Sequence, residues 1–172
     1  MDKITDVSTI PVGVVGLGLM GCSISTCLVI AGHPVIAVAP LPIDLLQAEK
    51  RIQGHLIHSK EHGLINQPAD FYFKQLNITE DYNQLKDCQV IIECTLEEIE
   101  IKKLVYEKIE AVISNEAILA SNTSAIPISL LQKQTLHPHR FFGLHWAEPS
   151  HTTRFLEIIC GELSDPVKAE FL

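Results

Sequence analysis

A short apolar run followed by three glycines at fixed spacing constrains the fold of this chain more than any other feature. Residues 12–15 contain three valines, which favour a β-strand, and Gly16, Gly18 and Gly21 follow at the G-x-G-x-x-G spacing. In such a segment the first glycine permits a tight turn, the second lets a pyrophosphate approach the backbone, and the third lets a helix pack closely on the strand. The segment therefore predicts a strand, a glycine turn and a helix.

The residues that follow support this interpretation. Residues 19–31 form a mostly apolar helical pattern that Gly32 ends, and residues 35–39 are a second short apolar run suited to a parallel strand. A strand, a glycine turn, a helix and a strand within about 30 residues make a βαβ unit, in which the helix N-terminus faces a bound phosphate. We therefore assign Leu19 and Met20, together with the three glycines, to cofactor binding.

One position departs from the usual dinucleotide site. The second strand of such a unit usually ends in an Asp or Glu that hydrogen-bonds the adenosine ribose. This chain has Ala39 there, followed by Pro40, and no arginine comes immediately afterwards to indicate NADP. The nearest carboxylate, Asp44, is expected inside the start of the next helix.

Strand and helix patterns alternate along the rest of the chain. We expect helices over residues 43–62 and 97–113, strands over 71–78, 87–94, 117–120, 141–146 and 155–159, and a last helix opened by Asp165 and Pro166. This alternation predicts an α/β fold of the Rossmann type: a single domain with a doubly wound, mostly parallel sheet and helices on both faces.

The composition restricts the functions to consider. The chain has 172 residues, 47% of them hydrophobic, which suits one domain with its own core. A formal net charge of -8 argues against a nucleic-acid surface. Five cysteines without a C-x-x-C pair favour reduced thiols in a cytoplasmic protein over a disulfide scaffold. We see no signal peptide at the N-terminus and no apolar run of the roughly 18 residues that a membrane span needs.

Three histidines of the helix expected over residues 43–62 could share one face. His55, His58 and His62 are spaced i, i+3 and i+7, and three imidazoles can bind zinc. No carboxylate or cysteine is placed to complete such a site. We therefore interpret the histidines as a solvated polar face and expect no metal.

Polar side chains follow the strand expected over residues 117–120. Ser121, Asn122, Thr123 and Ser124 lie at its carboxyl end, where folds of this kind bind ligands. Capping of the next helix is the alternative interpretation.

A histidine and a carboxylate stand alone in two neighbouring apolar strands. His145 interrupts the run over residues 141–146, and Glu157 interrupts the run over residues 155–159. A buried carboxylate is costly unless it is paired, so we expect the two side chains to meet. The pair is either a dyad with His145 as general base or a buried structural pair.

In this order the segments resemble the N-terminal NAD-binding domain of the L-3-hydroxyacyl-CoA dehydrogenase family. The resemblance runs from Val12 to about Leu172. Its carriers are Gly-Leu-Gly-Leu-Met-Gly (16–21), Gly-His-Pro-Val (32–35), Ile-Ile-Glu-Cys (91–94), Ser-Asn-Thr-Ser (121–124), Arg-Phe-Phe-Gly-Leu-His (140–145) and Leu-Glu-Ile-Ile (156–159). It implies an NAD-dependent oxidoreductase of fatty acid metabolism whose substrate is a small molecule, a 3-hydroxyacyl-CoA.

The resemblance also implies roles for single residues. His145 would take the proton from the substrate 3-hydroxyl as hydride passes to the nicotinamide, Glu157 would orient His145, and Ser124 would hydrogen-bond the reacting oxygen. Residues implied near the cofactor are Glu97, Lys102 and Asn122. For Glu97 and Lys102 the alternative is an exposed helix face.

Two departures from the family pattern affect substrate and base. The family's His-Phe-Phe-Asn-Pro is replaced by His145-Trp146-Ala147-Glu148-Pro149, and a carboxylate beside His145 would favour its protonated form. The CoA-contacting serine and lysine of the family fall at His55 and His62.

The family continues into a helical domain that closes the active site and forms a dimer. We expect residues 1–172 to hold only the NAD-binding domain, with a homodimer or a partner chain supplying the helical domain. Three hypotheses follow: a 3-hydroxyacyl-CoA dehydrogenase domain, a noncatalytic nucleotide-binding or assembly module, and a two-domain dehydrogenase for another hydroxy acid. None of the three involves nucleic acid or a membrane.

Overall fold

The computed structural model describes residues 10–153 and 155–172, and it begins with the expected βαβ unit. The unit comprises β1 (Val12–Val15), α1 (Leu19–Ala31) and β2 (Val35–Val38). α1 ends at Gly32, whose φ of 101° is left-handed, and the N–H groups of Gly32 and His33 donate to the carbonyls of Val29 and Leu28. Glycine adopts this conformation without the steric penalty that a Cβ brings. The expectation of no signal peptide concerns residues 1–9, which lie outside the described residues.

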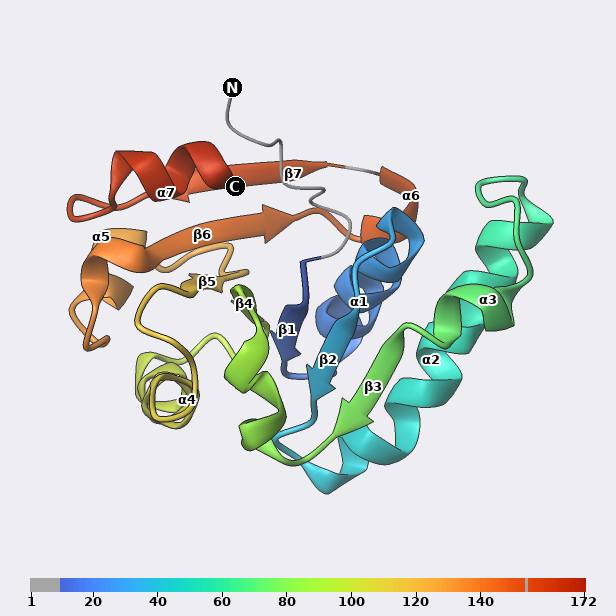
Figure 1. Cartoon of the computed structure of the whole chain (residues 1–172), viewed down its shortest axis with the longest axis horizontal. Coiled ribbons are helices and arrows are strands. Elements are labelled where there is room, and N and C mark those ends of the chain that lie inside the picture. Colours follow the sequence, from blue (N-terminus) through green and yellow to red (C-terminus); the bar gives the residue numbers. More distant parts are fainter. Residues whose placement is uncertain (1–9, 154) are drawn as a thin grey trace.

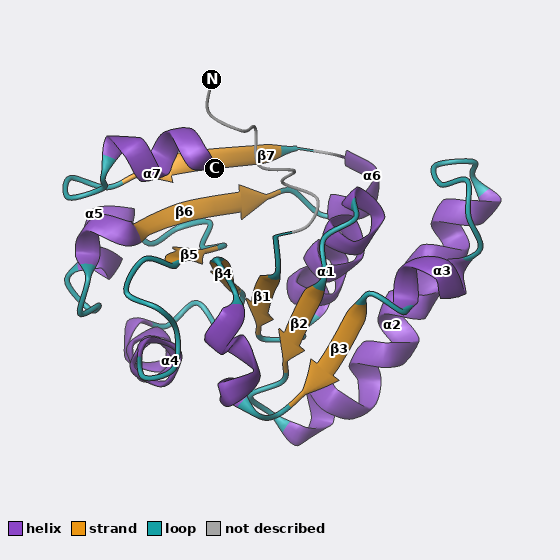
Figure 2. Cartoon of the chain, viewed as in Figure 1, coloured by secondary structure: helices purple, strands orange, loops and turns teal. Residues whose placement is uncertain are grey.

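The expected strands and helices follow, together with further short helices (Figures 1 and 2). They are α2 (Pro42–Glu61), α3 (Ala69–Phe73), β3 (Leu76–Thr79), the 3-10 helix η2 (Tyr82–Asp87), β4 (Val90–Glu93), α4 (Ile99–Glu110), β5 (Ile118–Ser121), α5 (Ile128–Gln132), the 3-10 helix η3 (Pro138–Arg140), β6 (Phe141–Trp146), α6 (Ser150–Thr153), β7 (Leu156–Cys160) and α7 (Pro166–Phe171). Asp165 caps α7 by accepting a hydrogen bond from the N–H of Val167 at 2.9 Å.

The strands form one sheet in the order β3-β2-β1-β4-β5-β6-β7. Neighbours from β3 to β6 pair in parallel, and β7 pairs antiparallel with β6. The chain runs outward from β1 to β3 and then returns to the other side of β1 at β4. Ligands of such sheets bind outside the carboxyl ends of the strands where the order reverses, here between β1 and β4.

Helices cover both faces of the sheet (Figure 1). On one face, Ile24 of α1 with Ile52 and Leu56 of α2 join a buried cluster, and on the other face Tyr106 and Ile109 of α4 do the same. Each fully buried side chain of this size contributes about 1.5–3 kcal/mol to folding. The expected doubly wound fold is therefore confirmed.

The expected strand over residues 71–78 is wrong in its first part. Ala69–Phe73 is the helix α3, and the strand begins only at Leu76. Ala69, Tyr72 and Phe73 pack against the core with the i, i+3, i+4 spacing of a helix. Phe71 lies on the outer side of this helix and is exposed.

The helix expected over residues 97–113 is shorter than predicted. α4 begins at Ile99 and ends at Glu110, so Glu97 precedes the helix instead of standing in its first turn. Within the described part of the chain, no helix has the length and apolar character of a membrane span.

Candidate functional site

The glycine turn leaves room for a phosphate at the N-terminus of α1. Gly16 has φ +99°, and a Cβ on Gly21 would lie 1.8 Å from the carbonyl oxygen of Gly16. A Cβ on Gly18, by contrast, would meet nothing within 4 Å. The first turn of α1 holds no acidic side chain. This open, uncharged helix N-terminus fits the pyrophosphate of a dinucleotide.

Two hollows adjoin the glycine turn and suit the two halves of a dinucleotide. One, of about 400 Å³, is mainly apolar, and its lining includes Gly18, Pro40, Leu41 and Asp44. The other, of about 260 Å³, is lined by Met20, Cys94, Thr95, Glu97, Lys102, Asn122, Ser124 and Ala125. A larger hollow of about 460 Å³ lies near the amino ends of β4 and β5, beside α7, away from the glycine turn. The structure thus brings the predicted cofactor residues together at the switch point of the sheet.

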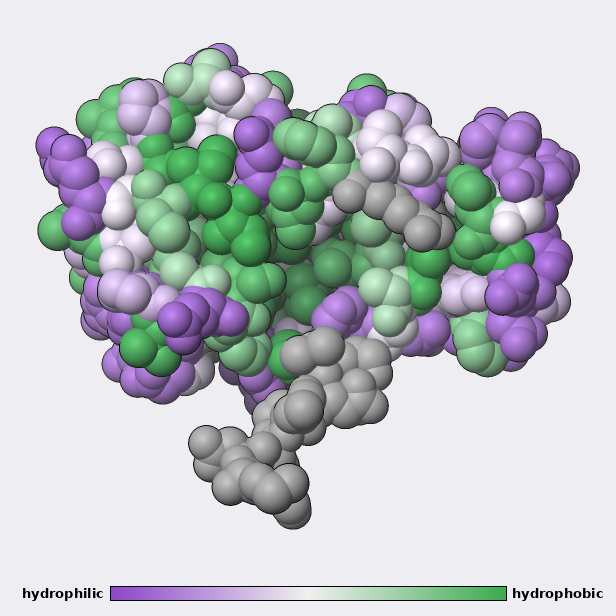
Figure 3. Space-filling view, turned by 90° about the horizontal axis from the view of Figure 1, so that it is seen from above, coloured by the Kyte–Doolittle hydropathy of each residue, from purple (hydrophilic) through white to green (hydrophobic). Residues whose placement is uncertain are grey.

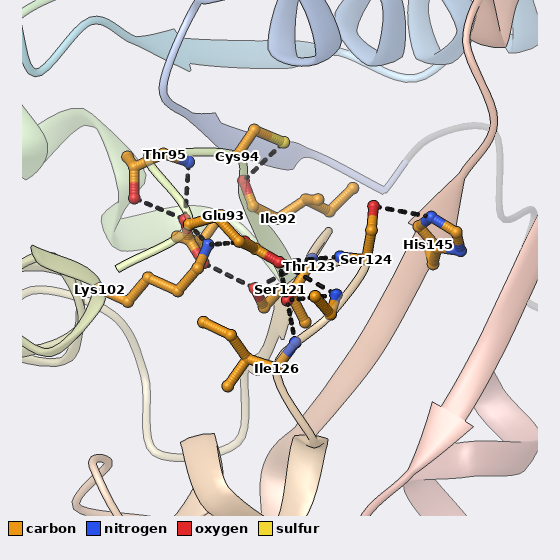
Figure 4. Close-up of polar contacts among 12 residues, drawn as sticks. Ile92, Glu93, Cys94, Thr95, Lys102, Ser121, Thr123, Ser124, Ile126 and His145 are labelled. Carbon is orange, nitrogen blue, oxygen red and sulfur yellow. Dashed lines mark hydrogen bonds and ion pairs between the residues drawn. The ribbon is translucent and has the colours of Figure 1, made fainter. Parts of the chain in front are cut away.

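A buried carboxylate beneath the polar hollow was not singled out by the sequence analysis. Glu93, at the end of β4, is 0% exposed and accepts hydrogen bonds from Lys102 Nζ at 2.8 and 3.0 Å. Tyr106 and Ser121 donate to its Oε2 at 3.0 and 2.7 Å, and the N–H of Thr95 donates to Oε1 at 2.6 Å. Figure 4 shows the contacts of Glu93 with Thr95, Lys102 and Ser121. Its sequence signal was a single carboxylate at the end of an apolar strand.

Lys102 lies inside the protein and not on an exposed helix face. Its side chain is 1% exposed, and its ammonium contacts both oxygens of Glu93 and also Oε2 of Glu97 at 3.3 Å. An ammonium has three donors, so these contacts occupy all of them. Lys102 thus joins the carboxylates of Glu93 and Glu97 beneath the polar hollow.

Glu97 fixes the loop that carries Ser124. Its Oε1 accepts hydrogen bonds from Thr123 Oγ1 and from the N–H groups of Ser124 and Ala125, the latter two at 3.0 and 3.1 Å. Burial disfavours the charged form of Glu97, but the hydrogen bonds from Thr123 and Ala125 and the ammonium of Lys102 outweigh it and lower its pKa. Glu97 is therefore an anion near neutral pH.

His145 contacts both of the side chains predicted to act with it. Its Nε2 lies 3.1 Å from Ser124 Oγ, as Figure 4 shows, and its Nδ1 lies 2.8 Å from Glu157 Oε2. The register of β6 and β7 sets His145 opposite Glu157.

The premise that this carboxylate is buried was wrong. Glu157 is 51% exposed and His145 is 24% exposed, because β7 is an edge strand whose residues are all exposed. The two side chains form an accessible pair, which excludes a buried structural pair.

Asn122 links the Ser124 loop to β6. Its Oδ1 accepts a hydrogen bond from the N–H of Trp146 at 2.9 Å. Glu148, beyond Trp146, is exposed, and among the described residues no hydrogen bond or ion pair joins it to His145. The charge of Glu148 raises the pKa of His151 instead, and no direct contact supports the expected influence of Glu148 on His145.

Two histidines of α2, His55 and His58, contact His151 of α6, and His58 also contacts His62, which follows the helix. The His55 and His151 rings are stacked with centroids 4.5 Å apart, and those of His58 and His62 are 4.1 Å apart. His58 and His62 are exposed as expected, whereas His55 is half-buried, so the solvated-face interpretation was wrong for it. Among residues 10–153 and 155–172 no group of His, Cys, Asp or Glu is arranged to hold a metal, and no disulfide joins the cysteines.

The fold and the glycine turn together define a dinucleotide-binding domain of the Rossmann class. Residues 11–170 match the family described as "3-hydroxyacyl-CoA dehydrogenase, NAD binding domain", so the chain belongs to this NAD-binding family.

Relatives and a solved structure agree with this assignment. The chain is 35% identical over 156 residues to the human peroxisomal bifunctional enzyme, covering 90% of this chain and 21% of the relative. It is 31% identical over 160 residues to a 3-hydroxybutyryl-CoA dehydrogenase of Bradyrhizobium diazoefficiens, covering 92% and 55%. The crystal structure of FadB2 of M. tuberculosis superposes with a TM-score of 0.87 at 31% identity, covering 92% of this chain and 56% of that one. The chain thus spans between about a fifth and about half the length of these proteins.

Proposed function

We propose that this chain is the NAD-binding and proton-transferring part of an oxidoreductase acting on 3-hydroxyacyl-CoA in fatty acid metabolism. The observation that carries the proposal is the row of contacts from Ser124 through His145 to Glu157, beside the polar hollow and the glycine turn. A hydroxyl, an imidazole and a carboxylate in this order can remove a proton from an alcohol.

The residues of the chain would divide the work as follows. The turn from Gly16 to Gly21 would hold the pyrophosphate of NAD. Bound NAD would accept the hydride from the carbon that carries the hydroxyl. Nε2 of His145 takes the hydroxyl proton, and Glu157 at Nδ1 stabilises the imidazolium that results. Ser124 Oγ orients the reacting oxygen.

A cover over the apolar side of β7 and α7 is part of this proposal. Figure 3, which views the side of β7 and α7, shows apolar residues gathered around a hollow. The exposed apolar side chains of β7 and α7 and of the segments beside them are Phe155, Leu156, Ile158, Ile159, Leu163, Val167 and Phe171. Soluble proteins rarely leave so many neighbouring apolar side chains uncovered. A helical domain is the cover that we propose, and it would also complete the substrate site.

Two measurements test the function. Reduction of NAD with 3-hydroxybutyryl-CoA is compared for the wild type and His145→Gln, and NADH binding is measured by calorimetry for both. We expect the variant to lose about 10²–10⁴-fold in turnover and to keep its NADH affinity. Equal rates would contradict the role of His145.

The same measurements distinguish two other functions from the proposed one. Binding of NADH without turnover of the wild type when the helical domain is present would favour a noncatalytic nucleotide-binding or assembly module, which Ala39 and Glu148 support. Turnover of a different hydroxy acid but not of the acyl-CoA would favour a two-domain dehydrogenase whose substrate choice Trp146 and Glu148 reshape.

A further inference from the structure

We propose that the cofactor site accepts NADP(H) as well as NAD(H), with Arg51 as the cation that receives the 2′-phosphate. The inference rests on the proposed cofactor site and concerns its selectivity. In this class of site the carboxylate at the end of the second strand binds the ribose hydroxyls, and an arginine nearby accommodates the phosphate. A carboxylate also repels a 2′-phosphate, because the two carry like charges.

In this chain the position that usually holds the carboxylate is Ala39, which can neither bind the ribose hydroxyls nor repel a 2′-phosphate. Ala39 follows β2 directly, its N–H donates to the carbonyl of Thr79 at 2.8 Å, and its side chain is 2% exposed. Its methyl group has no charge and no hydrogen-bonding atom. The end of β2 therefore neither favours the ribose 2′-hydroxyl nor rejects a phosphate in its place.

The nearest carboxylate is compensated by a cation. Asp44 lines the apolar hollow next to Pro40 and Leu41, and its Oδ1 lies 3.9 Å from Nη1 of Arg51. The two residues stand seven apart on α2, which sets them on one face of the helix. Asp44 could replace the missing carboxylate, but its charge is balanced locally, so its repulsion of a phosphate is weak.

Arg51 is held beside the glycine turn with donors to spare. Nη1 donates to the carbonyl of Leu17, between Gly16 and Gly18, at 3.2 Å, and Nη2 donates to Gln47. A guanidinium has five N–H donors, so donors remain for a phosphate beside these two contacts and one with the Cys22 thiol. The sequence offered no arginine directly after β2, and α2 brings this one back to the turn from farther along the chain.

The test compares NADH and NADPH binding to the full chain by calorimetry at one ionic strength. For the wild type we expect dissociation constants within about tenfold of each other. Arg51→Gln should weaken NADPH by about tenfold more than NADH, because one charged hydrogen-bond donor group is lost. Lys50→Gln removes the same charge from an exposed neighbour on α2 and should leave the ratio of the two constants unchanged.

Two further variants address the carboxylates. Ala39→Asp should raise the dissociation constant of NADPH relative to that of NADH by about tenfold or more, because the new carboxylate repels the 2′-phosphate. Because a charge at this buried position could perturb folding, circular dichroism accompanies it, and Asp44→Asn provides an independent change that should shift the ratio toward NADPH.

Three results would overturn the inference. In the first, the wild type binds NADH at least about 100-fold more tightly than NADPH, which would show that the site is selective for NAD(H). Another is an equal effect of Arg51→Gln and Lys50→Gln on the ratio. Failure of both nucleotides to bind would contradict the proposed cofactor site itself.

Discussion

The ammonium of Lys102 donates to both carboxylate oxygens of Glu93, at 2.8 and 3.0 Å, and both side chains are buried. The pair lies between β4 and α4, directly below the loop that Glu97 fixes. Two buried charges are tolerated only when each satisfies the other and the remaining lone pairs are occupied, as they are here by Tyr106 and Ser121. The pair therefore supports the predicted cofactor site from below.

Removing the cation from this pair should destabilise the fold. Lys102→Met leaves Glu93 as an uncompensated buried charge, and the expected loss in the free energy of unfolding is about 3–5 kcal/mol. Urea unfolding followed by circular dichroism measures it. Lys103→Met, the exposed neighbour on α4, is the control and should change stability by less than about 0.5 kcal/mol. Similar losses for the two variants would show that Lys102 and Glu93 are not coupled as described.

Alanine substitutions of Gly18 and Gly21 should separate the role of the turn in binding from its role in helix packing. Gly21→Ala brings a Cβ within 1.8 Å of the carbonyl oxygen of Gly16, so α1 must move, at a cost of about 1–3 kcal/mol or more. Gly18→Ala enters open space from a φ of -67°, which any residue adopts, so stability should change little. Its methyl group nevertheless occupies the space proposed for phosphate. We expect Gly18→Ala to weaken NADH binding, measured by calorimetry, without changing thermal stability. Unchanged binding would contradict the proposed position of the phosphate next to Gly18.

The stacked histidines should make stability fall in mild acid. Burial lowers the pKa of both His55 and His151; the charges of His58 and Arg51 lower that of His55 further against an opposing hydrogen bond to the Cys22 backbone, and the charge of His55 lowers that of His151 while Glu148 opposes it. His58 and Arg51 of α2 add positive charge on the same side. A histidine whose folded pKa lies below its unfolded value of about 6.5 takes up protons preferentially in the unfolded state.

The resulting stability is present above pH 6.5 and is lost as the pH falls through the lowered values. Each pKa unit of difference corresponds to about 1.4 kcal/mol. Urea unfolding of the wild type and of the double variant His55→Gln, His151→Gln at pH 7.5 and pH 5.5 measures the effect. The wild type should lose more stability than the double variant over this interval. Parallel losses would assign the acid sensitivity to other groups.

Local patterns were sufficient to predict the sheet and the glycine turn, because their signals lie within short stretches. The central strands β1, β2 and β4 are short apolar runs, and Asp165 with Pro166 marks the start of α7 in two residues. The His145 and Glu157 contact was predicted correctly but from a wrong premise, because Glu157 is exposed and the register of β6 and β7, not burial, sets the two side chains opposite one another.

Contacts between distant segments were not predictable from such patterns. Glu93 receives a hydrogen bond from Ser121, 28 residues away, and the His151 ring stacks on His55 of another helix. Neither partner carries a local signal, because hydroxyl and imidazole side chains occur equally on surfaces. The helix α3 was missed for a related reason: its apolar spacing fits a helix only once the core against which it packs is known.

Glu157 should determine which nitrogen of His145 carries the proton. An ionised carboxylate only accepts hydrogen bonds, so Oε2 at 2.8 Å from Nδ1 favours the tautomer with hydrogen on Nδ1. Nε2 is then unprotonated and can accept a hydrogen bond from Ser124 Oγ at 3.1 Å, or the proton of a substrate hydroxyl. Glu157→Gln replaces the acceptor by an amide that can also donate, which removes this preference.

The ¹⁵N chemical shifts of the His145 ring report the tautomer directly and do not require turnover. In the wild type at pH 8 we expect the Nδ1–H form to predominate, and in Glu157→Gln we expect a mixture of both tautomers. Where turnover is measurable, the variant should lose about 10²–10⁴-fold, because a base in the wrong tautomer cannot take the proton. Glu162→Gln, an exposed carboxylate just beyond β7, is the control. Identical ring shifts in the wild type and Glu157→Gln would show that the carboxylate does not orient His145 in solution.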